Sequence, residues 1–237
     1  MGNIFRFFLY SLTVFILFSC NQANEKISCE DILEDAYSSS SLNNFEKNKF
    51  KDLLANRYPE FDVMFQEAAE ETNIEKNLLA AISFQESQWD PRAKSNMGVR
   101  GMMMVTLETA ALVGVEKRLN PEQNIKGGAR YFAMLQEKNK VGVTHADKLS
   151  NTLASYNLGP TNIFNIANNI NKDVENVSWN QIKAKLKTME NSEIDIVESG
   201  SYTRGEQAID YVDRVKSYYQ LLSAHSCVAP KDQLAFF

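Results

Sequence analysis

The sequence is poor in the residues that build metal and nucleotide sites. Its 237 residues include only two histidines, His145 and His225, and three cysteines. Histidine, cysteine and carboxylate residues do not occur at metal-site spacing, and no Gly-rich segment has the pattern of a phosphate-binding loop. A catalytic triad would need one of two distant histidines to fold beside a serine. We therefore expect neither a metal nor a cofactor, and we interpret both histidines as surface or packing residues.

The sequence also lacks a cluster of positive charge and any sustained alternation of apolar and polar residues. Its 25 Lys and Arg residues are scattered, and the net charge is -5. A nucleic-acid partner is therefore not expected. A hydrophobic content of 44% excludes a mostly disordered chain, and the length suits one main domain. The periodicity that is present is helical, so we expect an all-α fold.

No apolar run is long enough to span a bilayer, which takes roughly 20 residues. The run Phe7–Phe18 has twelve residues, follows Arg6 and precedes the stretch "LFSC". This layout is typical of a secretory signal, and the stretch resembles a bacterial lipobox, in which a peptidase cuts before the cysteine and lipid is attached to it. We expect a signal peptide over 1–19 and lipidation of Cys20. An uncleaved anchor and a plain secretory signal are the alternatives.

Export and lipidation have two consequences. A lipidated Cys20 followed by Asn21, rather than by the Asp that resembles an inner-membrane retention signal, favours a periplasmic protein anchored in the outer membrane. The other two cysteines, Cys29 and Cys227, lie near opposite ends of the mature chain in an oxidising compartment. We expect a disulfide between them, with two unpaired thiols as the alternative.

The organisation of the remaining chain follows from composition and periodicity. Residues 20–57 are polar and are interpreted as a tether, with a possible short helix over Cys29–Tyr37. Helical periodicity then marks one domain over 58–225, followed by a tail over 226–237.

Within this domain, Asn120 and Pro121 are typical of a helix start, and Gly159 with Pro160 is typical of a helix stop. Gly127 and Gly128 lie inside the helix that follows Pro121, where glycine is unfavourable. Their presence predicts the close approach of another helix.

One carboxylate lies on an apolar helical stripe. Leu78, Ile82 and Glu86 are spaced four apart on a helix expected over 74–89, so Glu86 faces the same side as the two apolar residues. Burial and the negative end of the helix dipole both disfavour its ionised form, which suits a general acid. The spacing alone leaves open the alternative that Glu86 is a boundary residue with its carboxylate in water.

The residues that follow Glu86 change this balance. "ESQWDPRAKSNMGVRGMMMVTLETAALVGV", "NPEQNIKGGARYF" and "ASYNLGP" occur in this order, and "RGEQAIDYVDRVKSYY" comes late in the chain. Together these blocks resemble the signature of soluble-lytic-transglycosylase domains over roughly 58–224. Their wording is most similar to the membrane-bound lytic transglycosylase F branch. That branch usually carries an N-terminal solute-binding-like domain, for which we expect no room before the domain.

The resemblance implies a lysozyme-like, goose-type helical fold and an enzyme that acts on peptidoglycan glycan strands. Such lyases cleave the β-1,4 bond between N-acetylmuramic acid and N-acetylglucosamine without adding water, and they leave 1,6-anhydro ends. The single catalytic acid/base would correspond to Glu86. A lysozyme-type muramidase, with a second carboxylate such as Asp90, is one alternative. A non-catalytic peptidoglycan-binding lipoprotein is another.

Four further positions match substrate-binding positions of the family. Tyr156 would approach the catalytic site, Ser95 would contact the sugar or Glu86, and Met103 would line the saccharide groove. Gln207 aligns with a polar groove residue, with Glu206 one residue earlier, and the sequence does not distinguish which of the two faces inward. The alternatives are a core aromatic for Tyr156, a turn cap for Ser95 and core filling for Met103.

Overall fold

A computed structural model describes residues 28–188 and 203–227, whose regular elements are all helices. The elements are α1 (Cys29–Ser39), α2 (Asn44–Asn56), η1 (Tyr58–Glu60), α3 (Asp62–Thr72), α4 (Lys76–Ser87), α5 (Leu107–Val113), α6 (Pro121–Lys138), α7 (His145–Leu158), α8 (Pro160–Ile170), η2 (Val174–Asn176), α9 (Trp179–Thr188) and α10 (Arg204–His225). The described ranges contain no β-strand beyond isolated bridges among Lys94, Arg100 and Val105. The all-α expectation is confirmed.

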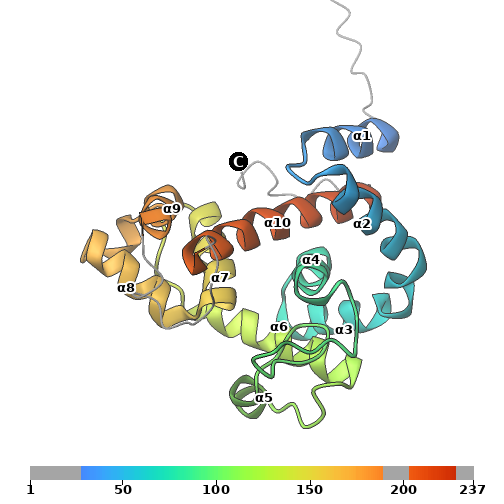
Figure 1. The fold of residues 1–237 in the computed structure, drawn as a ribbon, viewed down its shortest axis with the longest axis horizontal. Coiled ribbons are helices and arrows are strands. Elements are labelled where there is room, and N and C mark those ends of the chain that lie inside the picture. Colours follow the sequence, from blue (N-terminus) through green and yellow to red (C-terminus); the bar gives the residue numbers. More distant parts are fainter. Residues whose placement is uncertain (1–27, 189–202, 228–237) are drawn as a thin grey trace, which may run out of the picture.

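Helix α4 forms the centre of the core. Residues 77–84 are all buried, because α10 packs along α4 and α3 packs beside it. Figure 1 shows α10 crossing the molecule, with α7 and α9 near its start and α1 near its end. The end of α4 is thereby held in a fixed position inside the domain.

Local sequence signals account for the helix starts. Asn120 caps α6 by accepting a hydrogen bond from the Gln123 N–H, and Pro121 occupies the first helical position, as predicted. Thr203 and Glu206 form a reciprocal capping box at the start of α10. These caps satisfy backbone donors that a helix cannot pair internally.

Close packing explains the two glycines of α6. A Cβ atom on Gly127 would lie 2.2 Å from a methyl carbon of Val115, and one on Gly128 would lie 2.4 Å from Cβ of Met103. The predicted close approach is confirmed. The neighbour is not another helix, however, but the loop before α5 and the turn after it.

The short helix expected over Cys29–Tyr37 is present as α1 (Cys29–Ser39), but the tether expected around it is wrong for residues 44–56, which form α2. Phe50 and Leu53 of α2 are buried, and the Phe50 ring stacks on Tyr218 of α10 with centroids 5.4 Å apart. Glu46 of α2 forms an ion pair with Arg214 of α10. The few apolar residues of α2 are separated by Lys, Asn and Asp, so the composition looked polar although one face is apolar.

A disulfide joins the two ends of the described chain. Cys29 at the start of α1 is bonded to Cys227, just after α10, and their Cα atoms are 5.4 Å apart. The bond closes a loop with a sequence separation of 198 residues. The lipidation prediction for Cys20 and the signal peptide over 1–19 lie outside the described residues, as does most of the predicted tail.

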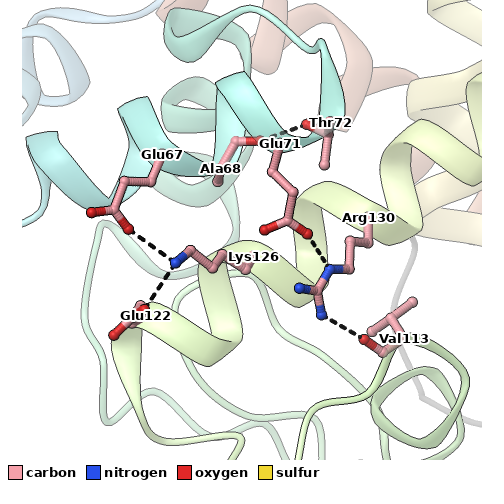
Figure 2. A network of polar contacts seen from close by, with 8 residues as sticks. All are labelled: Glu67, Ala68, Glu71, Thr72, Val113, Glu122, Lys126 and Arg130. Atoms are coloured by element: carbon pink, nitrogen blue, oxygen red, sulfur yellow. Dashed lines mark hydrogen bonds and ion pairs between the residues drawn. The ribbon is translucent and has the colours of Figure 1, made fainter.

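Polar contacts fasten α6 to α3 and α5 (Figure 2). Lys126 lies 2.9 Å from the Glu67 carboxylate of α3, and Arg130 pairs with Glu71 of the same helix. Arg130 also donates to the Val113 carbonyl at 3.0 Å, which satisfies a carbonyl in the last turn of α5. Exposed ion pairs contribute little each, at about 0 to 1 kcal/mol, so these pairs mainly fix how α6 lies against α3, while the Arg130 hydrogen bond holds the end of α5.

Candidate active site

The chain turns sharply directly after the last turn of α4. Gln88 and Trp89 are both left-handed, with φ of 54° and 58°. The Trp89 indole N–H donates to the Ala80 carbonyl at 2.9 Å, and Arg57 donates to the Gln88 carbonyl at the same distance. These two bonds compensate for an unfavourable backbone conformation. They hold the end of α4, and therefore Glu86, in place.

The Glu86 carboxyl is enclosed by protein although the residue as a whole keeps some exposed surface. Leu78 and Ile82, on the same stripe, are buried as the spacing predicted. Loss of solvation raises the pKa of Glu86 to about 7, and the Tyr211 hydroxyl acts in the opposite direction. Near neutral pH the carboxyl therefore exists in both its protonated and its ionised form.

Two tyrosines from different helices face this acid. Burial, and then the charge of ionised Glu86, raise the pKa values of Tyr156 on α7 and Tyr211 on α10. The Tyr156 hydroxyl donates to the Met103 carbonyl at 2.8 Å, and its ring lies 5.5 Å from that of Tyr131. The buried Tyr211 hydroxyl is directed toward Glu86 and favours the ionised form of its carboxyl.

Sequence reasoning placed Tyr156 near the acid but missed Tyr211. The buried residues Ala208, Val212 and Val215 form an apolar stripe on α10 that runs beside Tyr211. A buried phenol beside two apolar positions is the signal that could have identified it, because a buried tyrosine hydroxyl usually needs a polar partner.

Met103 does not line a groove, so that prediction is wrong. Its side chain is fully buried and fills the space that Gly128 leaves by having no Cβ. Its backbone is what faces the site: the carbonyl receives the Tyr156 hydroxyl, and the N–H donates to Oδ1 of Asn124 at 2.7 Å. The Met103 carbonyl therefore holds the Tyr156 hydroxyl in position.

Asn124 of α6 organises the loop that carries Met103. Its amide nitrogen donates to the carbonyls of Arg100 and Arg118 at 3.0 and 2.8 Å, and the residue is completely buried. Gly101 makes room for it, since a Cβ there would lie 2.4 Å from the Asn124 amide nitrogen. This role was not predicted, although Asn124 opens the Asn-Ile segment of the second block.

Ser95 closes a turn of the same loop. Its Oγ accepts a hydrogen bond from the Val99 N–H at 3.3 Å, and its own N–H donates to the Val99 carbonyl at 3.1 Å. No bond to Glu86 occurs among the described contacts of Ser95. Asp90 likewise serves its own loop, because its Oδ1 accepts from the Arg92 N–H at 2.9 Å.

At the start of α10 the roles of Glu206 and Gln207 separate. The Glu206 carboxylate accepts the Thr203 N–H at 2.8 Å as part of the capping box. Gln207 accepts a hydrogen bond from Arg204 at 3.3 Å and remains partly exposed. Glu206 is thus bonded to the backbone of the N-cap residue, whereas Gln207 is bonded to a side chain, that of Arg204.

The geometry defines a helical domain built around one desolvated carboxylic acid, placed at a helix end and faced by two tyrosines. Residues 63–180 match the family model of the Transglycosylase SLT domain. The chain belongs to this family. Within residues 28–188 and 203–227, no group of three or more His, Cys, Asp or Glu side chains is arranged to hold a metal ion.

The chain matches only part of the length of its curated relatives. It is 39% identical over 172 residues to membrane-bound lytic murein transglycosylase F 1 of Alkalilimnicola ehrlichii, a match that covers 71% of this chain and 34% of that protein. The protein of the same type from Maricaulis maris is 37% identical over 179 residues, covering 74% and 39%. The chain thus spans well under half the length of these relatives.

Among solved structures, the 70 kDa soluble lytic transglycosylase of Escherichia coli matches 70% of this chain and 24% of its own chain, with a TM-score of 0.49 and 20% identity.

Tyr211→Phe is expected to raise the pKa of Glu86 further above 7, because the hydroxyl that favours the ionised carboxylate is removed. The pKa is measured from the Glu86 carboxyl carbon by NMR of protein labelled at glutamate. Tyr219→Phe is the matched control on the same helix, since the Tyr219 hydroxyl donates to Glu75 instead. An unchanged pKa of Glu86 in Tyr211→Phe would contradict the assigned role of Tyr211.

Proposed function

We propose that this protein is a peptidoglycan lytic transglycosylase that cleaves the β-1,4 bond between N-acetylmuramic acid and N-acetylglucosamine and leaves 1,6-anhydro ends. The observation that carries the proposal is Glu86: a desolvated carboxyl with a pKa of about 7, inside a transglycosylase SLT domain. The names of the relatives, which are lytic murein transglycosylases, support the same activity.

The reaction needs one carboxyl group in two protonation states. Protonated Glu86 first donates its proton to the glycosidic oxygen, and the bond to the leaving N-acetylglucosamine breaks. The resulting carboxylate then accepts the proton of the muramic acid 6-hydroxyl, whose oxygen attacks the anomeric carbon and closes the anhydro ring. A pKa of about 7 suits both steps at neutral pH, because neither form is scarce.

The remaining residues bind and position the saccharide in this proposal. Tyr156, whose hydroxyl is bonded to the Met103 carbonyl, is proposed to support the acetamido and cationic region of the muramic acid. Ser95 and Gln207 are proposed to contact the glycan, since both are partly exposed. Met103 acts through its backbone, because its side chain has no exposed surface.

The test is mass spectrometry of the products released from purified sacculi. A transglycosylase gives muropeptides that end in 1,6-anhydromuramic acid, one water lighter than reducing-end products. Reducing ends would instead indicate a lysozyme-type muramidase. Binding to sacculi without release of products would indicate a non-catalytic peptidoglycan-binding lipoprotein.

We further propose that Cys20 carries lipid and anchors the protein in the outer membrane, facing the periplasm. The lipobox-like stretch supports this location, as does the membrane-bound type of the relatives. Among the helices of the described residues, none has the length and apolarity to cross a bilayer.

Cys20→Ala is expected to move the protein from the membrane fraction to the soluble periplasmic fraction, because a lipidated cysteine supplies the anchor. Cell fractionation and immunoblotting measure the distribution. Ser38→Ala, at an exposed position of α1, is the control and should stay with the membrane. Membrane association of Cys20→Ala would favour an uncleaved anchor.

A further inference from the structure

An apolar groove lies between α6 and the pair α7 and α8, and we name it the α6–α8 groove. Its volume is about 540 Å³. Buried Leu135, Val141 and Ile163 contribute to its lining, together with Phe164 and Leu112, whose side chains are 49% and 61% exposed. Large apolar side chains with so much exposed surface at one groove indicate a binding surface.

The groove adjoins the candidate active site across two aromatic rings. Tyr131 lines the groove, and its ring centroid is 5.5 Å from that of Tyr156. Tyr156 in turn lies within the electrostatic reach of Glu86. A ligand in the groove is therefore separated from the acid by two adjoining aromatic rings.

The groove is also positively charged in a chain whose net charge is negative. Lys138 and Lys140 line it, and its described lining contains no carboxylate. Neither lysine has an ion-pair partner among the described residues. Glu137, which is next to Lys138 in sequence, lines a different hollow between α3 and α6. The two ammonium groups are thus available to an anionic ligand.

One component of peptidoglycan complements both the apolar lining of the groove and its two lysines. The glycan carries hydroxyl and acetamido groups, and the lactyl carboxyl of muramic acid is consumed in an amide bond, so the saccharide is uncharged. The attached peptide stem carries free carboxylates and the methyl groups of alanine residues. Carboxylates complement lysine, and methyl groups complement an apolar floor.

We propose that the α6–α8 groove binds the peptide stem of peptidoglycan and makes the protein prefer peptide-bearing over bare glycan, an inference that rests on the proposed function. The stem provides the anionic groups for Lys138 and Lys140, while the glycan to which it is attached reaches Glu86 past Tyr131 and Tyr156. Selection of substrate would then act at a site distinct from the acid.

The first experiment measures binding and does not depend on turnover. The full chain, in detergent and carrying Glu86→Gln, is titrated by calorimetry with a muramic-acid-containing tetrasaccharide that bears tetrapeptides. The same tetrasaccharide is then used after an amidase has removed the peptides and the lactyl carboxyls that this frees have been converted to methylamides, so that the bare probe is uncharged. Adding Lys138→Gln and Lys140→Gln is expected to weaken binding of the peptide-bearing probe about fivefold, and to leave binding of the bare probe unchanged.

A matched control separates the groove from a general loss of charge. Lys185 and Lys187 lie in the last turn of α9, as Lys138 lies in the last turn of α6. Neither lines the groove. Lys185→Gln with Lys187→Gln removes the same charge and should change neither titration. Equal weakening for both probes, or no weakening for either, in the Lys138 and Lys140 variant would overturn the proposal.

The second experiment measures the preference during turnover with Glu86 intact. The ratio of kcat/KM for peptide-bearing strands to that for bare strands is expected to fall about fivefold in the Lys138 and Lys140 variant, and to fall in the wild type as salt is added. An unchanged ratio would overturn the proposal. If the wild type releases no anhydro products from either strand, the proposed function fails, and the titrations still decide what the groove binds.

Discussion

Glu86→Gln is expected to lower the release of anhydro-ended muropeptides by about a thousandfold or more. General acid catalysis is worth about 10² to 10⁴ in rate, and in the proposed reaction the same group also acts as the base. An amide of the same shape can perform neither step. Initial rates on purified sacculi, with products resolved by mass spectrometry, measure the effect. Residual activity above a few per cent would count against Glu86 as the sole acid.

Asp90→Asn provides the matched control, because it neutralises a nearby carboxylate that serves only its own loop in the described structure. We expect this variant to retain most of its activity. A loss as large as that of Glu86→Gln would point to a second catalytic carboxylate, and hence to hydrolysis of the lysozyme type.

Glu86→Gln also has a predictable effect on stability. In the folded protein the pKa of Glu86 is about 7, above its ordinary value of 4.5. Between these two values the folded state holds more protons than the unfolded state, so the free energy of unfolding falls as the pH rises through this window. Glu86→Gln removes that fall. The variant should therefore gain stability relative to the wild type between pH 4.5 and 7, as measured by urea unfolding.

Loss of the disulfide is expected to give the largest effect on stability. Cys29→Ser with Cys227→Ser should lower the free energy of unfolding by about 4 kcal/mol, because the bond closes a loop with a sequence separation of 198 and restricts the unfolded chain. Urea unfolding of the oxidised wild type and of the double variant measures this difference.

Reduction gives an independent check on the same bond. A reductant should destabilise the wild type by about the same amount and leave the double variant unchanged, since the variant has no bond between these positions. A difference below about 1 kcal/mol between wild type and double variant would show that this bond adds little to the stability of the folded domain.

The features predicted correctly from the sequence depend on neighbours along the chain. Asn120 with Pro121 marks the start of α6, and the spacing of Leu78, Ile82 and Glu86 places the acid on the buried face of α4. Both follow from helix geometry, in which residues four apart share a face. They required no knowledge of which helix packs against which.

The features that were missed depend on contacts between distant segments. Met103 is buried because Gly128, on another helix, leaves room for it. Tyr211 faces Glu86 because α10 lies along α4. The segment over 29–56 was interpreted as a tether because its apolar residues are few, yet Phe50 and Glu46 both contact α10. Composition and periodicity carry no information on such pairings.

The position of α10 has a consequence for the order in which the protein can fold. This helix covers α4 and contacts α1, α7 and α9, and it comes last among the described helices. A growing chain that has not yet reached residue 204 therefore leaves the apolar surface of α4 without its cover, and Glu86 without Tyr211. Completion of the core therefore requires α10, and a chain truncated before residue 204 is expected to lack a complete core.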